Sequence, residues 1–229
     1  MQNARQDAGA TAASPFTEAG FRLLAGRALY RAPPASASNP GRGEPQSPGD
    51  FDLNPEHSAE LGALPAPRPA AVLVPIVARA GLTVLLTQRT DSLPTHAGQI
   101  SFPGGKMEAG DLDPLATALR EAEEEIGLDP RFVDTLGYLD PYRTGTGYRI
   151  FPVVALIRDG FELALDANEV ADAFEVPLAF LMDERNHETH LRPWRGAEHR
   201  FYAIPFQQRY IWGATAGIMK NMHQRLFSA

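Results

Sequence analysis

The sequence predicts an α/β (α+β) fold, in which a mixed central β-sheet carries helices on its faces. Two observations support this prediction: strand-like apolar segments alternate with an amphipathic helix in the middle of the chain, and a second helical segment closes it. The 229 residues are enough to bury one full-sized hydrophobic core.

The first 66 residues differ in composition from the rest of the chain. They are rich in Ala, Pro, Ser and Gly, which predicts a linker and not a core. Only residues 14–30 have the pattern of an amphipathic helix, with Ser14 as N-cap and Pro15 in the first helical position. We therefore expect an N-terminal extension over residues 1–66, whose removal costs little stability, and a folded domain over residues 67–229.

The strands follow from short apolar runs between turn residues. Residues 70–78 and 82–89 predict a hairpin, joined through Arg79, Ala80 and Gly81. Residues 99–103 predict a short strand that leads into the pair Gly104 and Gly105. The remaining expected elements are three strands over 132–140, 147–159 and 200–206 and a closing helix over 212–227.

The central helix has clear start and stop signals. Asp113 is a suitable N-cap, Pro114 suits the first turn, and Gly127 followed by Asp129 and Pro130 predicts the end. An apolar stripe along this helix should face the sheet, and it comprises Leu115, Ala118, Leu119, Ala122 and Ile126.

Three carboxylates lie beside this stripe. Glu121, Glu124 and Glu125 span about 100° of helical arc, whereas Glu123 projects away from them. Like charges this close repel, and Arg120 is the basic residue among them. A divalent cation would compensate the three charges, so the pattern predicts a metal site for Mg²⁺ or Mn²⁺.

Residues 104–128, GGKMEAGDLDPLATALREAEEEIGL, closely resemble the Nudix box of the diphosphate-cleaving Nudix hydrolases. The resemblance implies a Nudix-type α/β/α sandwich and metal-dependent hydrolysis of a diphosphate. It implies Glu121, Glu124 and Glu125 as metal ligands, with Glu121, Glu124 and Arg120 as catalytic residues. We expect Arg120 to orient a box carboxylate through a bidentate pair.

The box departs from the commonest family pattern at two points. Asp111 stands where that pattern has Glu, and eight residues instead of seven separate it from Arg120. Two roles for Asp111 remain open: a metal ligand that acts through water, or a residue that serves only the turn.

Residues 85–105, LLTQRTDSLPTHAGQISFPGG, resemble the additional motif of the coenzyme A pyrophosphatase branch. This resemblance implies hydrolysis of coenzyme A, and of acyl-CoA, to adenosine 3′,5′-bisphosphate and 4′-phosphopantetheine or its acyl form. Arg89, His96 and Lys106 are the candidate substrate-binding residues, each with an alternative structural or solvated role. Glu169 is either an outlying metal carboxylate or an acid at a helix start.

Two other functions remain open. The chain can be a Nudix pyrophosphatase for another nucleoside diphosphate derivative, such as ADP-ribose or NADH, or a non-catalytic ligand-binding Nudix module. The presence of Glu121, Glu124 and Glu125 disfavours the non-catalytic module, because a ligand-binding module does not need the metal carboxylates. Trp212 and Phe201 can stack on a base, but aromatic residues at strand or helix ends usually belong to the core, where we expect them.

Composition excludes several classes of site and partner. The chain has no cysteine, so a thiolate metal site and a disulfide framework are impossible. Its longest apolar run is strand-sized and its start lacks a hydrophobic signal core, so we expect a cytoplasmic protein without a membrane partner. The net charge of -7 argues against nucleic acid as a partner and leaves room for a small phosphorylated substrate. The oligomeric state is not predicted.

Overall fold

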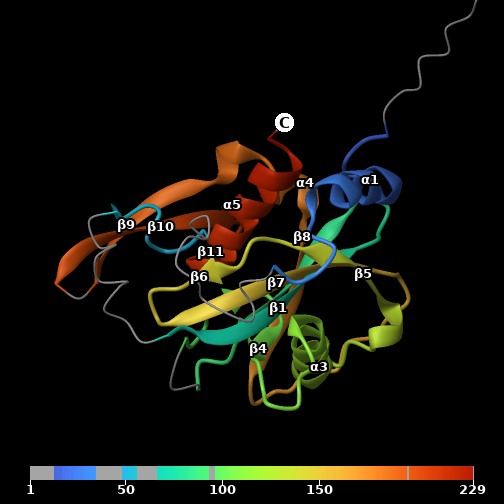
Figure 1. Cartoon of the computed structure of the whole chain (residues 1–229), viewed down its shortest axis with the longest axis horizontal. Helices are drawn as coiled ribbons and strands as arrows, with labels where there is room; N and C mark the ends of the chain where they lie inside the picture. The colour runs from blue at the N-terminus through green and yellow to red at the C-terminus, as the bar shows by residue number, and fades with distance from the viewer. Residues whose placement is uncertain (1–12, 35–47, 56–65, 93–95, 195, 229) are drawn as a thin grey trace, which may run out of the picture.

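A computed structural model describes residues 13–34, 48–55, 66–92, 96–194 and 196–228 (Figure 1). The strands are β1 (Arg68–Val77), β2 (Thr83–Arg89), β3 (Ile100–Ser101), β4 (Gly104–Lys106), β5 (Val133–Tyr138), β6 (Tyr142–Arg143), β7 (Tyr148–Ile157), β8 (Val170–Pro177), β9 (Glu188–Trp194), β10 (Ala197–Phe206) and β11 (Arg209–Trp212). The helices are α1 (Glu18–Ala28), α3 (Pro114–Ile126), α4 (Leu178–Leu181) and α5 (Ala214–Leu226), with short 3₁₀ turns η3 (Pro130–Phe132) and η4 (Glu184–Asn186).

The central sheet is mixed, as the sequence predicts. It has eight strands, of which β3-β2-β1-β7-β5 form the main path while β4, β6 and β8 pair with β1, β7 and β2. Strands β1 and β7 run parallel over ten residue pairs, and the other pairings are antiparallel. The expected hairpin is confirmed as β1 and β2. Strand β8 was not predicted, and it closes the sheet beside β2.

Alternate residues of the central sheet enter two different hydrophobic cores, because successive side chains of a strand point to opposite faces. Leu73 and Val77 of β1 pack with α3 in the smaller core. Val74 and Ile76 pack in the larger core with α1, α4, α5 and the strands β10 and β11. The sheet is therefore covered on both sides, and α3 lies alone on its own face (Figure 1). In the described part of the chain, none of the helices is long and apolar enough to cross a membrane.

Helix α3 has the predicted boundaries. The Asp113 side chain accepts a hydrogen bond from the Ala116 amide, Pro114 is the first helical residue, and Gly127 ends the helix at φ 66°, in the left-handed region. The expected apolar stripe is only partly correct. Ala118, Ala122 and Ile126 are buried, but Leu119 is half-buried and outside both cores, and Thr117 is buried in its place. Thr117 tolerates burial because its hydroxyl donates to Asp111.

The N-terminal helix begins later than predicted. Its N-cap is Thr17, whose hydroxyl accepts from the Gly20 amide at 3.2 Å, and Ser14 lies in the preceding turn. The carbonyl of Ser14 accepts hydrogen bonds from both the amide and the hydroxyl of Thr17, so this turn continues the chain into the helix.

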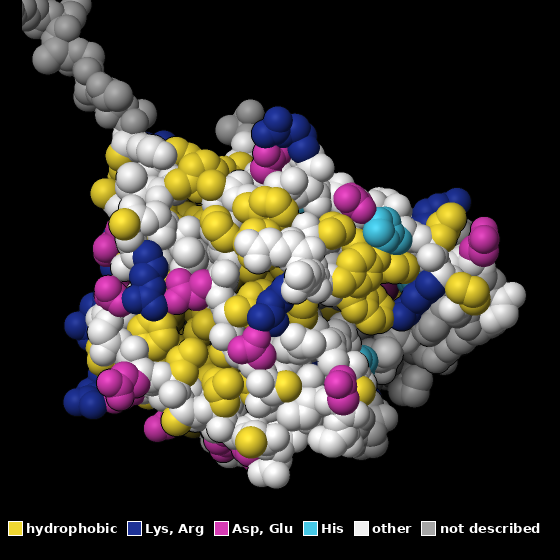
Figure 2. All heavy atoms as spheres, turned by 180° about the vertical axis from the view of Figure 1, so that it is seen from behind, with side chains coloured by type: hydrophobic (Ala, Val, Ile, Leu, Met, Phe, Trp, Pro, Cys, Tyr) yellow, Lys and Arg dark blue, Asp and Glu magenta, His cyan; other side chains and the backbone are white. Residues whose placement is uncertain are grey.

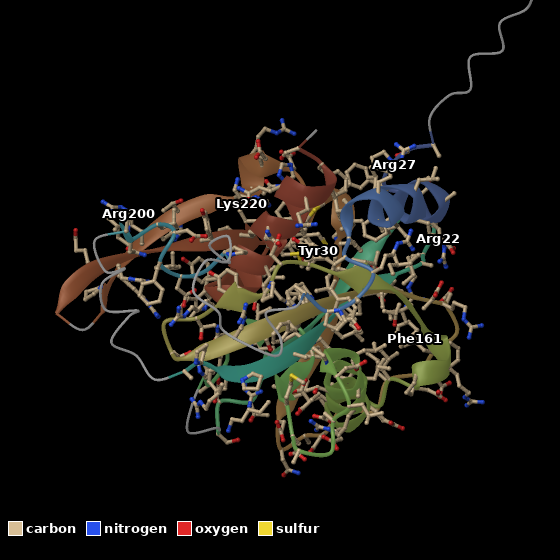
Figure 3. The ribbon with its side chains drawn as sticks, viewed as in Figure 1. Arg22, Arg27, Tyr30, Phe161, Arg200 and Lys220 are labelled. Atoms are coloured by element: carbon tan, nitrogen blue, oxygen red, sulfur yellow. The ribbon has the colours of Figure 1, made fainter. Side chains whose placement is uncertain are left out.

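The expectation that the N-terminal segment adds little packing is wrong. Phe21 of α1 is 0% exposed and belongs to the larger core, and Arg22 forms an ion pair with Asp134 at 2.5 Å (Figure 3). The backbone of Tyr30 bridges to Tyr138 of β5. Helix α1 is therefore part of the folded unit, because Phe21 is buried in the larger core and α1 and Tyr30 contact β5. The boundary at residue 66 stays a prediction.

The start and end of the folded chain also meet. The ring of Phe16 stacks on Phe227 with 5.5 Å between centroids, and Arg225 donates to the carbonyl of Ala28 at 2.7 Å.

The segment at Asn54 is also held to the fold. Asn54 is fully buried: its side chain donates to the carbonyl of Arg200 at 2.8 Å and accepts from the amide of Arg200 at 2.7 Å. The segment before the central sheet is thus fastened to β5, α5 and β10.

The strand expected at 200–206 is present as part of β10, but it lies outside the central sheet. It forms a second, three-stranded antiparallel sheet in the order β11-β10-β9. His190 lies in β9 and His187 directly precedes this strand in extended conformation, so the two histidines do not share a helix face. The face of this sheet that carries Ile204 and Ile211 packs in the larger core.

The burial of Phe21 yields a stability prediction. Replacing Phe21 by Ala removes a fully buried ring and should lower the free energy of unfolding by about 3–5 kcal/mol, measured by urea denaturation. Leu23→Ala is the matched control on the same helix, because Leu23 is 58% exposed and its loss should cost less than about 0.5 kcal/mol. Equal effects of the two changes would show that α1 does not dock in solution.

Candidate active site

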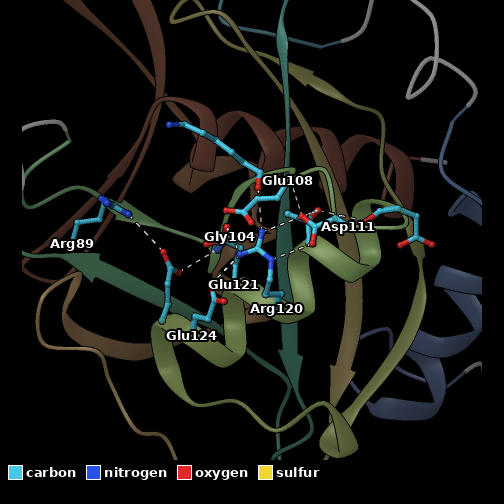
Figure 4. A network of polar contacts seen from close by, with 11 residues as sticks. Arg89, Gly104, Glu108, Asp111, Arg120, Glu121 and Glu124 are labelled. Carbon is cyan, nitrogen blue, oxygen red and sulfur yellow. Dashed lines mark hydrogen bonds and ion pairs between the residues drawn. The ribbon is translucent and has the colours of Figure 1, made fainter.

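The predicted carboxylates lie where the second half of α3 faces the turn that carries Gly104 (Figure 4). Helix α3 packs on β1 and β4, so Glu125 and Glu121 come close to the glycine pair that precedes them in the chain. The end of β2 brings Arg89 to the same place. One helix, one turn and one strand end therefore build the site.

Glu125 is the most buried charged group of the site, at 5% exposed. Its Oε2 accepts from the Gly104 amide at 3.2 Å, and its Oε1 lies 3.6 Å from a guanidinium nitrogen of Arg89. Burial raises the pKa of Glu125 to about 7, and the nearby Glu121 adds to this, while the Gly104 amide and Arg89 oppose it. Burial of a carboxylate with one distant cation leaves its negative charge poorly compensated.

The glycine pair is required by close approach. A Cβ on Gly105 would lie 2.3 Å from an Oε of Glu121, and a Cβ on Gly104 would lie 2.4 Å from the carbonyl oxygen of Ala71. A side chain at position 105 would displace the Glu121 carboxylate, and one at position 104 would strike the backbone of β1. The two glycines therefore allow backbone and carboxylate to share one small space.

Arg120 is the centre of a second part of the site. Its guanidinium makes two hydrogen bonds to Asp111, from Nε at 3.1 Å and from a terminal nitrogen at 3.0 Å. The remaining terminal nitrogen lies 3.0 Å from Glu121 and 2.9 Å from Glu124. The predicted bidentate pair of Arg120 with a carboxylate of the box is present, and its partner is Asp111, while Glu121 and Glu124 receive single contacts.

Asp111 is a residue of the turn that also anchors Arg120. It accepts from the Glu108 amide and from the Thr117 hydroxyl, both at 2.8 Å, in addition to Arg120. Four donated hydrogen bonds, led by those from Arg120, hold the pKa of Asp111 far below its ordinary range. Arg120 thus lowers the pKa of Asp111, and Asp111 in turn raises the pKa of Arg120. The structure shows Asp111 in the turn and bonded to Arg120, and a role for Asp111 as a metal ligand through water stays a prediction.

The three carboxylates differ in exposure. The side chain of Glu121 is 17% exposed and that of Glu124 is 60% exposed. Burial raises the pKa of Glu121, Arg120 lowers it, and the charges of Glu124 and Glu169 raise it again. Glu123 is exposed and lies on the other side of α3, as its helical phase predicts.

The structure brings some of the predicted substrate residues to the site and leaves others at its edge. Arg89 lies between Glu125 and Glu169, with a guanidinium nitrogen 3.8 Å from an Oε of Glu169. Lys106 has an exposed side chain, and its carbonyl accepts from Arg120 at 3.2 Å. His96 follows further along the loop and its Nδ1 lies 2.7 Å from the Gln99 amide oxygen.

The donor set suits a hard divalent cation, although the ligands do not yet converge on one point. Among the described residues, no three His, Cys, Asp or Glu side chains are already gathered as a metal site. Arg120 and Arg89 lie among the carboxylates and partly neutralise them. The oxygen donors, the burial of Glu125 and the raised pKa of Glu121 all fit Mg²⁺ or Mn²⁺, which prefer carboxylate ligands.

Two features of the site were not predictable from the sequence. The Gly104 amide as a partner of Glu125 depends on the docking of α3 on the sheet. Thr117 looked like an ordinary helix residue, yet its hydroxyl supports Asp111. The sequence hints at this role only by placing a polar residue, Thr117, next to the apolar stripe of the helix.

The comparison with family models decides the family. Residues 67–195 match the model described as NUDIX domain, which is more than half of the chain. The chain belongs to the Nudix family. It is a Nudix hydrolase, and it has the fold that the box implied.

Named relatives agree with this assignment. The chain is 42% identical over 159 residues to a protein of Photorhabdus laumondii named uncharacterized Nudix hydrolase NudL, which covers 69% of this chain and 85% of the relative. It is 38% identical over 183 residues to the protein of the same name from Yersinia enterocolitica, covering 80% of this chain and 87% of the relative.

Solved structures are more distant. A binary complex of the Caenorhabditis elegans Ap4A hydrolase is similar at 22% identity and a TM-score of 0.42, over 48% of this chain and 80% of that chain.

Membership of the Nudix family also bears on the metal. Nudix hydrolases generally use divalent metal ions, which agrees with the carboxylate oxygen donors of α3.

The arrangement on α3 predicts unequal roles for four neighbouring glutamates. Glu121, Glu124 and Glu125, changed singly to Gln, should each lower kcat by about 10²–10⁴, because each removes a charge that a divalent cation or the reacting groups need. Glu123→Gln is the matched control and should leave kcat nearly unchanged. Steady-state assays at saturating Mg²⁺, with thermal melts of each variant, make the comparison. Similar losses at all four positions would disprove the helix phase.

The Asp111 contacts predict a pH-dependent stability difference. The folded-state pKa of Asp111 lies below its ordinary value of 3.8, so its ionised form stabilises the fold above that pH and this contribution is lost as the pH falls further. Asp111→Asn should therefore be less stable than the wild type at pH 7, and this difference should begin to shrink only below about pH 3.8 and vanish near the much lower folded-state pKa of Asp111. Urea denaturation at several pH values tests this. A constant difference across the whole range would show that the Asp111 charge is not involved.

Proposed function

We propose that this Nudix hydrolase cleaves the diphosphate bond of coenzyme A and of acyl-CoA. The products are adenosine 3′,5′-bisphosphate and 4′-phosphopantetheine or its acyl form. One observation carries the proposal: Arg89, in the segment that resembles the coenzyme A pyrophosphatase motif, lies 3.6 Å from Glu125 of the box. The two motifs therefore contribute residues to one site. We expect the protein to act in the cytoplasm.

Each residue of the site has a role in this proposal. Glu121, Glu124 and Glu125 hold Mg²⁺ or Mn²⁺, with Glu169 as a further carboxylate at the rim. The cation neutralises charge on the diphosphate and lowers the pKa of attached water. Arg120, held by Asp111, keeps Glu121 and Glu124 together before the cation binds.

Arg89 has two partners in this proposal. In the absence of substrate it pairs with Glu125 and Glu169. When a cation takes over those carboxylates, its guanidinium becomes available to a phosphate oxygen, for which its planar fork is well suited. We expect Lys106 and His96 to be further donors to the substrate.

The substrate assignment predicts a clear order of specificity constants. Coenzyme A carries a 3′-phosphate that dephospho-CoA and ADP-ribose lack, and one charge-assisted contact of about 1.5–3 kcal/mol corresponds to about ten-fold to a hundred-fold in kcat/KM. CoA should therefore exceed both in kcat/KM with Mg²⁺ and with Mn²⁺. Mass spectrometry of the products identifies the bond that is cleaved.

The competing assignments give different outcomes in the same assay. ADP-ribose or NADH turned over as well as CoA would disprove the branch assignment and leave the family. Binding of these compounds without turnover of any of them would indicate a ligand-binding module instead of an enzyme.

A further inference from the structure

The face of the three-stranded sheet that points away from the larger core carries aromatic and basic side chains that belong to neither hydrophobic core, and Asn54 covers this face at His199. We call this set the aromatic face, and it comprises His190, Arg192, Phe201, Tyr210 and Trp212. Because strand residues alternate between faces, these side chains lie opposite Ile204 and Ile211, which enter the larger core. The expectation that Phe201 and Trp212 are core residues is wrong. Figure 2 shows hydrophobic side chains with a His and basic side chains at their edge on the lobe of β9–β11.

Arg192 is the centre of the aromatic face. Its guanidinium carbon lies 4.6 Å from the ring centroid of Trp212 and 5.6 Å from that of Phe201. The two rings meet edge-on, with 5.5 Å between their centroids. A guanidinium stacked in this way is held in one orientation and presents its N–H edge to an acceptor.

The acceptor is missing from the described part of the chain. Nε of Arg192 is buried and has no hydrogen-bond partner among the described residues. A buried donor without an acceptor costs free energy, so a ligand that supplies an anionic oxygen would bind with a gain. Glu188 does not supply it, because its carboxylate lies 2.6 Å from Nε2 of His190, whose Nδ1 lies 2.5 Å from the Tyr210 hydroxyl.

The aromatic face is joined to the metal carboxylates by a short series of contacts. Glu125 lies 3.6 Å from Arg89, and the Arg89 amide donates to the Gln99 carbonyl at 3.0 Å. The side chain of Gln99 lies beside Gly213, at 3.8 Å from the position of a Cβ there. Trp212 directly precedes Gly213 in the chain. A substrate held at the carboxylates would have to cross the Gln99 segment to reach Trp212.

We propose that the aromatic face binds the adenosine 3′-phosphate end of the substrate. The adenine is planar and stacks on rings and on a guanidinium, and the 3′-phosphate supplies the anionic oxygen that Arg192 lacks. This inference rests on the proposed function, because only a substrate with that end needs both a stacking surface and a cation away from the diphosphate. Arg89 is a weaker candidate for the 3′-phosphate, since it serves the carboxylates.

Binding of the product tests this proposal without catalysis. Isothermal titration calorimetry of the full chain, with no metal added, compares adenosine 3′,5′-bisphosphate with 5′-AMP. The bisphosphate should bind about ten-fold to a hundred-fold more tightly, the effect of one charge-assisted contact. Arg192→Gln should remove that preference and bring both Kd values together.

Two further variants keep the result interpretable. Arg192→Lys retains the charge but loses the planar fork, so it should recover only part of the preference and should remain folded if Arg192→Gln does not. Arg185→Gln is the matched control, because Arg185 is an exposed arginine of η4 paired with Asp183, and it should bind both ligands like the wild type. Thermal melts of all three establish that they fold.

Three results would overturn the inference. They are equal binding of the two ligands by the wild type, an unchanged preference in Arg192→Gln and Arg192→Lys, or a dimer in sedimentation that dissociates when Arg192 is changed. The first two leave the proposed function standing if CoA is still hydrolysed. Failure of CoA hydrolysis, with the bisphosphate preference intact, would instead remove the proposed function and leave a binding surface.

Discussion

The burial of Glu125 is the constraint on which the site depends. A carboxylate at 5% exposure needs partners, and the chain supplies one amide, of Gly104, and one guanidinium, of Arg89. Both come from outside α3, so the helix is tied to the end of β2 and to the glycine turn. Burial raises the pKa of Glu125 to about 7, which means that its ionised form is disfavoured in free energy. A bound cation would stabilise that ionised form. The close approach of Gly105 to Glu121 has the same origin.

Arg120 and Asp111 organise the other half of the site by a local mechanism. Asp111 lies in the turn before α3, and Arg120 lies two helical turns into it, so their pair fixes the turn against the helix. The guanidinium then reaches Glu121 and Glu124, whose like charges would otherwise separate. The site is thus held ready by two arginines with different attachments. One is anchored by the turn and the other by the sheet.

The second hydrophobic core explains why the chain needs residues before the central sheet. Helix α1 fills the larger core through Phe21, and α5 and the three-stranded sheet complete it. This layer lies across the sheet from α3, and strands β1 and β2 contribute alternate residues to both cores. The end of β2 therefore carries Arg89 toward the carboxylates, while Gln88 on its other face meets Arg209 of β11. Strand β2 therefore contacts both the carboxylate site, through Arg89, and strand β11 of the three-stranded sheet, through Gln88.

The sequence by itself determined the local elements and their chemistry. The boundaries of α3 from Asp113 to Gly127 follow from capping and turn preferences, which act within a few residues, and the phase of Glu121, Glu124, Glu125 and Glu123 follows from helical periodicity. The tertiary structure decided what these groups meet. Whether Arg120 pairs with Asp111 or with a glutamate, whether Phe21 packs, and whether Trp212 and Phe201 enter the core depend on how distant segments dock. Periodicity records which side of an element is apolar, but it carries no information on which partner covers that side, because packing contacts join residues far apart in the chain.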